Sequence, residues 1–329
     1  MLMKKRNNAK KFAYLCALLI LVLVMLYSGL RILESTVLRP QQGGEANTVS
    51  KTITRDGIDY FPRQDITTVL VMGIDRYGKV ESSGSYQNPG AADVLMVLVF
   101  DETNNTVDVL HLNRDTMVEM PALGLGGRQA GTFYGQLALS HTYGSGLEDS
   151  CENVVATVSD LLYGIRIDYY VAMNMDAIAI LNDAVGGVTV TVADDFSQVD
   201  GSLPMGQVTL KGEQAVSFVR SRQGVGDQLN LSRIERQKAY IDGFADAFRA
   251  KQGDPEFFVT TYDLVAPYLV TNCSATTISS MMERYGDYAI RDVLSPAGEN
   301  VAGKDYMEFY LDEETLDDMI IGLFYDEKK

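Results

Sequence analysis

The chain has 329 residues, 46% of them hydrophobic, which is enough to bury one large core or two modest ones. Its 44 aspartates and glutamates outnumber its 28 lysines and arginines, and its formal net charge is −16. Because nucleic acids favour basic surfaces, this balance argues against nucleic acid as a partner.

The N-terminus has the pattern of a membrane anchor. Five lysines and arginines within residues 1–11 precede an uncharged run over residues 12–30, which Arg31 closes. A helix of that length spans a bilayer. The segment has no convincing small-residue cleavage site, so we expect a retained transmembrane helix and not a cleaved signal peptide. The positive-inside rule places the tail in the cytoplasm and the chain after Arg31 on the outer side of the cell membrane.

Beyond the anchor, a polar segment predicts a linker up to about residue 50, and Asp56-Gly57 predicts a small hairpin. Apolar runs of strand type and segments with helical spacing then alternate. This alternation predicts an α/β layered domain with a largely buried sheet. The expected strands are 66–74, 94–100, 107–112, 169–174, 188–192 and 305–311. The expected helices are 133–143, 147–163, 176–185, 212–219, 232–251, others after residue 255 and an acidic one at the C-terminus, with a flexible loop at 124–131.

Two cysteines, Cys151 and Cys273, lie outside the anchor, whereas Cys16 lies within it. An extracytoplasmic pair is compatible with a disulfide. Two buried thiols are the alternative, because the sequence does not show whether the two Cα atoms approach within bonding range.

An arginine cluster over residues 219–237 runs against the acidic composition of the chain. Arg220 and Arg222 stand two positions apart in a segment that we expect to be extended, so their side chains project to the same side. Several forked guanidinium groups suit a multiply charged phosphate. A run of solvated surface arginines is the plainer alternative.

The second half of this cluster opens a helix, because Ser232 followed by Glu235 forms a capping box. Arg233, Arg236 and Gln237 share one face of the first turn. The unpaired backbone N–H groups and the positive end of the helix dipole lie there too. The turn is therefore a candidate anion site.

Two aspartates are candidate ligands of a cation. Asp75 ends one predicted strand and Asp93 precedes the next, and a glycine-rich loop between them allows both to reach one edge of the sheet. Two carboxylates that share a site repel each other, and Mg²⁺ relieves this when water and phosphate oxygens complete its coordination. The alternative is that Asp75 caps a turn and Asp93 is a solvated loop residue.

Asp115 directly follows Arg114, and it either orients that arginine or acts as a base near the acceptor. The sequence has no G-x-S-x-G, H-E-x-x-H or Walker A motif. We interpret His111 and His141 as structural residues. Phosphoryl transfer needs positioning and charge neutralisation more than a covalent nucleophile, and two aspartates, a cation and several arginines supply both.

Eight short motifs follow one another along the chain. They are V-L-V-M-G-I-D-R at 69–76, A-D-V-L-M at 92–96, N-R-D-T at 113–116, I-D-Y-Y-V at 167–171, D-A-V-G-G-V at 183–188, G-E-Q-A at 212–215, V-R-S-R at 219–222 and R-I-E-R-Q at 233–237. Their order and spacing resemble the LytR-CpsA-Psr family from about residue 66 to residue 245. The basic tail, single anchor and external domain resemble it too.

The resemblance implies an αβα sandwich with a mixed central sheet behind one transmembrane helix. It also implies a Mg²⁺-dependent phosphotransferase that moves a glycopolymer, such as teichoic acid or capsule, from a polyprenyl-pyrophosphate carrier to peptidoglycan. The implied organisation is a cytoplasmic tail (1–11), transmembrane helix (12–30), linker with hairpin (31–64), catalytic domain (65–252) and C-terminal extension packed on that domain (253–329).

By the same resemblance, Asp75 and Asp93 hold Mg²⁺, and an apolar tunnel between sheet and helices holds the lipid chain. The residues implied in catalysis are Arg114, Asp115, Arg220 and Arg222. The residues implied in pyrophosphate binding are Arg76, Arg114, Arg220, Arg222, Arg233, Arg236 and Gln237.

The chain departs from the family pattern in three places. Ala91 replaces an arginine that often stands two residues before the second aspartate, residues 138–144 differ from the usual motif, and residues 255–329 match poorly. Two other functions stay open. One is hydrolysis of the lipid pyrophosphate, and the other is a non-catalytic envelope module that binds pyrophosphate lipid or wall polymer without a metal.

Overall fold

The structure, a computed structural model, describes residues 52–327 apart from several short gaps. The gaps are 125–127, 222–223, 226–235, 237–238, 241, 245, 249, 252–254, 275–276, 278–279, 282–283 and 287. The predicted tail, transmembrane helix and linker thus lie outside the described residues, as do Arg222, Arg233 and Gln237. None of the helices in the described part is long and apolar enough to cross a bilayer.

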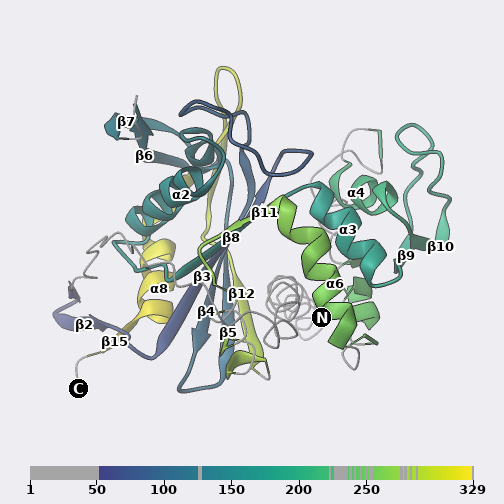
Figure 1. The fold of residues 1–329 in the computed structure, drawn as a ribbon. Helices are drawn as coiled ribbons and strands as arrows, with labels where there is room; N and C mark the ends of the chain where they lie inside the picture. The colour runs from purple at the N-terminus through teal and green to yellow at the C-terminus, as the bar shows by residue number, and fades with distance from the viewer. Residues whose placement is uncertain are drawn as a thin grey trace, which may run out of the picture.

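A six-stranded sheet with the order β11-β8-β3-β4-β5-β12 forms the centre of the fold (Figure 1). The three middle strands pair antiparallel, β8 and β12 add in parallel, and β11 closes one edge antiparallel. The predicted α/β class and mixed sheet are therefore confirmed. The strands are β3 (Ile66–Ile74), β4 (Ala92–Asp101), β5 (Thr106–Leu112), β8 (Tyr169–Asn174), β11 (Leu269–Thr271) and β12 (Ala289–Leu294).

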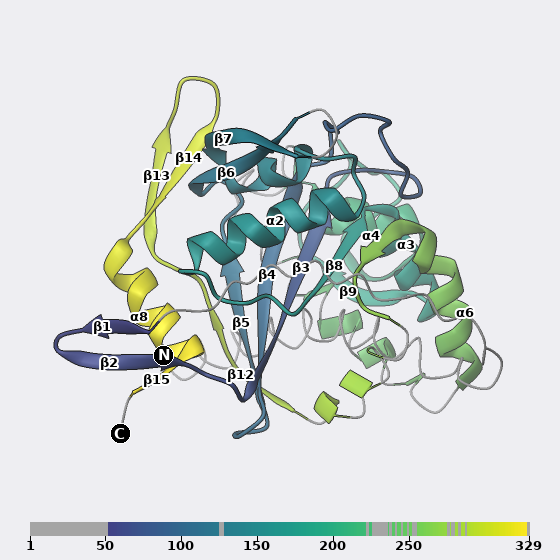
Figure 2. The same ribbon diagram turned by 60° about the vertical axis from the view of Figure 1, so that its left-hand side comes forward.

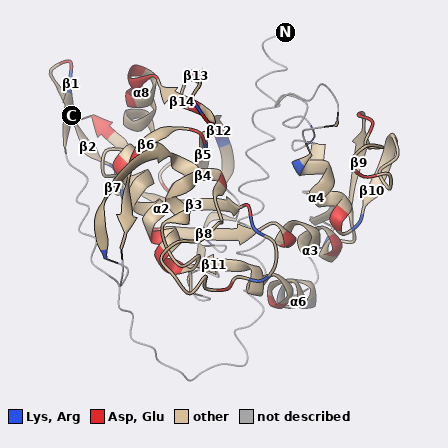
Figure 3. Cartoon of the chain, turned by 90° about the horizontal axis from the view of Figure 1, so that it is seen from above, with Lys and Arg blue, Asp and Glu red and all other residues tan. Residues whose placement is uncertain are grey.

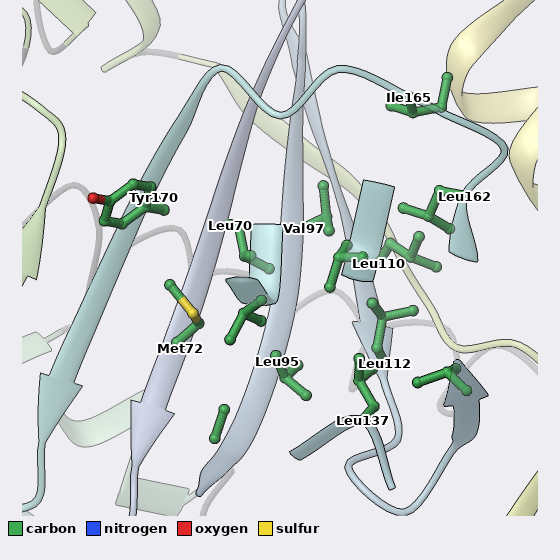
Figure 4. Close-up of a cluster of buried hydrophobic side chains, with 14 of the residues drawn as sticks. Leu70, Met72, Leu95, Val97, Leu110, Leu112, Leu137, Leu162, Ile165 and Tyr170 are labelled. Atoms are coloured by element: carbon green, nitrogen blue, oxygen red, sulfur yellow. The ribbon is translucent and has the colours of Figure 1, made fainter. Parts of the chain in front are cut away.

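Side chains of β3 alternate between two core clusters, one on each face of the sheet. Leu70 and Met72 enter the cluster beneath α2 (Glu148–Leu161) and α8 (Glu313–Phe324). Figure 4 shows this cluster, in which side chains of neighbouring strands point toward the same layer. Residues of odd number in the same strand, beginning with Val69, enter the other cluster. An apolar run without polar alternation therefore forms a strand that is buried on both faces.

A third core cluster lies beside the β8–β11 edge of the sheet (Figure 1). Phe196, Phe218, Phe244 and Phe248 are fully buried within it. The cluster fixes the position of a helix whose last residue is Arg220. Its elements include α3 (Asp176–Ala184), β9 (Val188–Val192), β10 (Gly206–Leu210), α4 (Glu213–Arg220) and α6 (Pro255–Val265), which continues into the 3₁₀ helix η3 (Ala266–Tyr268).

The stretch at residues 117–143 differs from the prediction. In place of a loop at 124–131 and a helix at 133–143, β6 (Met117–Leu123) and β7 (Gln129–Gln136) form an antiparallel hairpin, and only η2 (Leu137–Thr142) is helical. Strand pairing with β6 and the aromatic pair at the start of the predicted helix favour a strand there. The helical spacing belongs only to the residues after Gln136.

The C-terminal segment, from residue 269 to residue 327, contributes strands to three sheets. Strands β11 and β12 form the two edges of the central sheet, and β13 (Gly298–Ala302) pairs with β14 (Met307–Leu311) in a hairpin that rises beside β6 and β7 (Figure 2). After α8, β15 (Tyr325–Glu327) joins the predicted Asp56-Gly57 hairpin, β1 (Ile53–Arg55) and β2 (Ile58–Pro62). The hairpin prediction is confirmed.

Both cysteines in the described part of the chain are free thiols, so the predicted alternative of a Cys151–Cys273 disulfide is wrong for this structure. The physical reason is their position. Cys151 lies in the core cluster under α2, and Cys273 packs against the cluster on the opposite face of the sheet. Burial raises the pKa of both thiols, which makes them unreactive packing residues.

Candidate active site

Charged residues gather at one end of the central sheet. Ile74, the last residue of β3, pairs with Ala92 at the start of β4 and with Asn174 at the end of β8. Leu112, the last residue of β5, pairs with Leu95 of β4. Asp75, Asp93 and Arg114 therefore belong to one end of the sheet, as predicted for the two aspartates. Figure 3 shows these strand ends side by side from above.

Asp93 lies inside β4 and not before it, because the pairing of β3 with β4 shifts register at this point. Val94 pairs with Gly73 and Ala92 with Ile74, which leaves Asp93 as the extra residue of a β-bulge. A bulge re-aims the side chain of its extra residue. The bulge needs glycine on the partner strand, since a Cβ on Gly73 would lie 3.0 Å from that of Val94.

Arg220 stands at the end of α4, a helix of the third core cluster, and its side chain reaches the end of β3. It is the last residue of α4, so it is helical and not extended as predicted. Its Nη2 donates to Asp75 Oδ1 at 2.9 Å, and its Nη1 donates to the Tyr77 hydroxyl at 2.8 Å. The guanidinium also lies over the Tyr77 ring, 5.4 Å from the centroid. Tyr77 is a site residue that sequence reasoning missed.

Arg114 forms the second ion pair of the site. Its Nη1 contacts Asp93 Oδ1, and its Nε lies 3.4 Å from Asp115 Oδ1. Gln136 Nε2 donates to the same Asp115 oxygen at 2.7 Å. Of the two alternatives for Asp115, these contacts match the orienting role, because its carboxylate holds the Arg114 side chain beside Asp93.

The side chains of both ion pairs are partly accessible to water, but the Asp93 Oδ1 atom that contacts Arg114 is itself buried. The side chains of Arg220 and Asp75 are 47% and 39% exposed, and those of Arg114 and Asp93 are 36% and 26% exposed. A pair as exposed as Arg220–Asp75 contributes about 0–1 kcal/mol. Arg220 and Asp75 can therefore separate and bind stronger partners at little cost in free energy.

Arg236 has a different place from the one predicted. It is 5% exposed, and its Nε, Nη1 and Nη2 donate to Phe218 O, Asp194 Oδ2 and Ser221 O respectively. The guanidinium lies over the ring of Phe196. Its contacts hold the backbone at both sides of Arg220, so Arg236 positions that residue and does not face an open anion site.

Arg76 is an exposed residue directly after Asp75. Its carbonyl accepts from the backbone N–H of Met175, which joins the loop after β3 to the start of α3. The other predicted members of the anion site, Arg222, Arg233 and Gln237, lie outside the described residues.

The residues present fit a magnesium ion that keeps most of its water. Asp75 and Asp93 supply carboxylate oxygens at one strand end, and no group of three His, Cys, Asp or Glu side chains forms a closed metal cage among the residues that the structure describes. Mg²⁺ commonly binds through one or two carboxylates with phosphate oxygens and water. The donor set therefore suits Mg²⁺ better than a metal that needs nitrogen or sulfur ligands.

His141 fixes the loop that precedes Asp93. Its Nδ1 lies 2.7 Å from Gly90 O, so this nitrogen carries the proton, and Asn88 Nδ2 donates to the His141 carbonyl at 2.8 Å. The imidazole is buried, and burial lowers its pKa. The prediction that His141 is structural agrees with these contacts. Asn88, which also donates to Gly144 O and Ser150 Oγ, was missed because its partners lie more than fifty residues away.

The lowered pKa of His141 predicts an acid-sensitive fold. Above the pKa of an unfolded histidine, about 6.5, the group is neutral in both states and costs nothing. As the pH falls below 6.5, His141 binds a proton in the unfolded chain but not in the folded chain, so the free energy of unfolding declines. We expect the melting temperature to fall between pH 7 and pH 5, and to fall less in His141→Gln. Equal pH slopes for both proteins in thermal unfolding would contradict this role.

One pocket of about 320 Å³ opens between the start of α2 and the α6–η3 connection. Its lining includes Val80, Leu147, Pro267 and Leu269, but none of the four ion-paired residues. The pocket is therefore separate from the charged site. The apolar tunnel predicted for a lipid chain stays a prediction.

The fold and site define an α/β protein with a mixed sheet that presents carboxylates and arginines at one strand end. The sequence model of the LytR-CpsA-Psr family matches residues 37–319, and the chain belongs to this family. The chain is 27% identical over 249 residues to the polyisoprenyl-teichoic acid–peptidoglycan teichoic acid transferase TagU of Oceanobacillus iheyensis, covering 72% of this chain and 70% of that protein.

Two solved structures show the same fold. Lin1025 of Listeria innocua has a TM-score of 0.53 and 25% identity, covering 78% of this chain and 96% of that one. TagV of B. subtilis has a TM-score of 0.56 and 24% identity, covering 79% and 96%. The family assignment made from the eight motifs is thus confirmed.

Proposed function

We propose that this chain is a Mg²⁺-dependent phosphotransferase that moves a glycopolymer from a polyprenyl-pyrophosphate carrier to peptidoglycan, on the outer side of the cell membrane. The observation that carries the proposal is the presence of two arginine–aspartate contacts, Arg220 with Asp75 and Arg114 with Asp93, at one end of the sheet. The names of the curated relatives support the polymer and the acceptor as classes.

The charges of the site suit a metal diphosphate. In this structure each carboxylate is neutralised by an arginine. A bound diphosphate would attract Arg114 and Arg220, and their release would free Asp75 and Asp93 for a cation. Because the Arg220–Asp75 pair is exposed, the exchange costs little at that pair. When bound, Mg²⁺ would neutralise charge on the phosphate oxygens.

In the proposed reaction the acceptor hydroxyl forms a P–O bond at the phosphorus that carries the glycopolymer. The bond from that phosphorus to the bridging oxygen breaks, polyprenyl phosphate leaves, and the hydroxyl releases its proton. The two arginines place the diphosphate and stabilise its developing charge, which is the main catalytic requirement of phosphoryl transfer. Asp115 and Gln136 keep Arg114 in position for this task.

The exchange of Asp75 for asparagine tests the metal assignment. Loss of one carboxylate should raise the Mg²⁺ concentration for half-maximal transfer at least about tenfold. Loss of a residue that only hydrogen-bonds to a metal ligand already lowers metal affinity about 10–100-fold, and loss of the ligand itself should lower it at least as much. Transfer of a short-chain lipid-linked glycopolymer to peptidoglycan is measured over a Mg²⁺ titration. Asp168→Asn, at the other end of the sheet, is the control. A titration curve that is unchanged in Asp75→Asn would contradict the cation site.

The same assay separates the proposal from its two alternatives. Release of free glycopolymer phosphate without product on peptidoglycan would indicate a hydrolase. Binding of the lipid pyrophosphate that persists in chelator, without turnover in Mg²⁺, would indicate a non-catalytic envelope module.

A further inference from the structure

Three tyrosines are exposed on the two hairpins beside the active site. Tyr134 of β7 is 56% exposed, and Tyr306 and Tyr310, at the turn and in β14, are 42% and 41% exposed. Large side chains that gather on an exposed surface commonly mark an interaction site. We call these three residues the tyrosine surface.

The three rings belong to two neighbouring hairpins. Glu308 and Tyr310 stand at alternate positions of β14, so they project to the same face, and Tyr306 lies in the turn directly before that strand. The Tyr310 hydroxyl donates to Glu308 at 2.7 Å, and this bond is the first cause that raises the pKa of Tyr310. Figure 2 shows the β13–β14 hairpin beside β6 and β7, and the hydrogen bond from Gln136 of β7 to Met307 O of β14 joins the two hairpins.

Hydrogen bonds tie the tyrosine surface to the active site. Phe309 N donates to Asp115 O at 2.9 Å, and Thr116 and Phe309 form a parallel β-bridge. Gln136 Nε2 donates both to Asp115 Oδ1 at 2.7 Å and to Met307 O at 2.8 Å. Because Asp115 also contacts Arg114, the surface adjoins the ion-paired residues at the end of the sheet.

The negative charge near the three tyrosines favours a neutral polymer over an anionic one as the ligand of this surface. Glu119 lies directly across from Tyr134 in the β6–β7 ladder, Glu299 lies across from Tyr310, and Glu308 accepts the Tyr310 hydroxyl bond. These carboxylates repel a polyanion such as a phosphate-linked polymer. They accept hydrogen bonds from neutral hydroxyl groups, and exposed tyrosine rings offer rigid apolar faces with a polar tip. A neutral glycan presents both hydroxyl groups and C–H faces.

We propose that the tyrosine surface binds the neutral glycan backbone of the acceptor, and so guides an acceptor hydroxyl to the diphosphate held at Arg114 and Arg220. The identity of the acceptor as peptidoglycan rests on the proposed function, whereas the chemistry of the ligand rests on the surface itself.

Cosedimentation with peptidoglycan from which all secondary polymers have been stripped tests the proposal without donor or metal. The double variant Tyr134→Ala/Tyr310→Ala should bind at least tenfold more weakly than the unchanged protein. Phe61→Ala, which removes an exposed aromatic ring from the β1–β2 hairpin, is the matched control and should bind normally. Tyr306→Ser, at the exposed turn, is a second variant for the case in which the double variant does not fold, and it should also bind more weakly.

Equal binding by the folded tyrosine variants and Phe61→Ala would overturn the inference. So would binding of a purified anionic wall polymer that is lost in the tyrosine variants while their binding to stripped peptidoglycan is unchanged. Binding that depends on the tyrosines without any transfer would sustain the inference and refute the proposed transferase. Normal transfer to peptidoglycan by the tyrosine variants would refute the inference and leave the transferase intact.

Discussion

Replacement of Arg220 by alanine is expected to lower kcat/KM for glycopolymer transfer about a thousandfold, in line with the loss of an arginine that stabilises phosphoryl transfer. The side chain is 47% exposed and contacts Asp75 and Tyr77. Because an exposed pair contributes about 0–1 kcal/mol to stability, the melting temperature should change little. The loss should therefore appear in activity and not in folding.

Steady-state transfer kinetics of Arg220→Ala, Arg220→Lys and Arg166→Ala check this expectation. Lysine restores the charge but not the planar fork, so Arg220→Lys should recover only part of the activity. Arg166 forms an ion pair with Asp168 at the other end of the sheet and is 76% exposed, so its loss should leave transfer intact. Near-normal turnover in Arg220→Ala would remove the central assignment of the site.

The second large effect is on stability. Arg236→Ala is expected to lower the free energy of unfolding by about 3–5 kcal/mol, the range for breaking a buried pair by removal of one partner. The variant leaves Asp194, 22% exposed in its side chain, without this cation, and it strips the carbonyls of Phe218 and Ser221 of their donor. Misplacement of Arg220 should lower activity as well.

The free energies of unfolding of Arg236→Ala and Arg284→Ala, measured with denaturant, separate the effect of losing a buried arginine from the effect of losing a positive charge. Arg284 pairs with Glu102 but is 61% exposed, so its loss should cost less than about 1 kcal/mol. Equal losses in the two variants would show that Arg236 is not the buried support of α4.

The sequence was a good guide to the sheet because its middle strands are buried on both faces. The run from Ile66 to Ile74 has the predicted bounds, since an apolar run bounded by polar residues has few other structures open to it. The prediction of a helix at residues 133–143 is wrong for Phe133–Gln136, which belong to β7. Its short aromatic stretch becomes a strand only because β6 pairs with it, and periodicity cannot show a partner.

Part of the site could be predicted because it lies at the ends of these buried strands. The place of Asp75 and Asp93 follows from two strands in sequence joined by a loop. The burial of Arg236 depends on Asp194, which is distant in the sequence, and the bulge at Asp93 depends on the register opposite Gly73. Tertiary contacts of this kind are invisible to local spacing.

In the proposed site, two aspartates and two arginines converge on one metal diphosphate. A crystal structure with Mn²⁺, as a stand-in for Mg²⁺, and a short-chain polyprenyl pyrophosphate tests this convergence. We expect an anomalous peak bonded to carboxylate oxygens of Asp75 and Asp93, with Arg114 and Arg220 moved onto the diphosphate. A manganese peak elsewhere, with both arginine–aspartate pairs intact beside a bound diphosphate, would contradict this expectation.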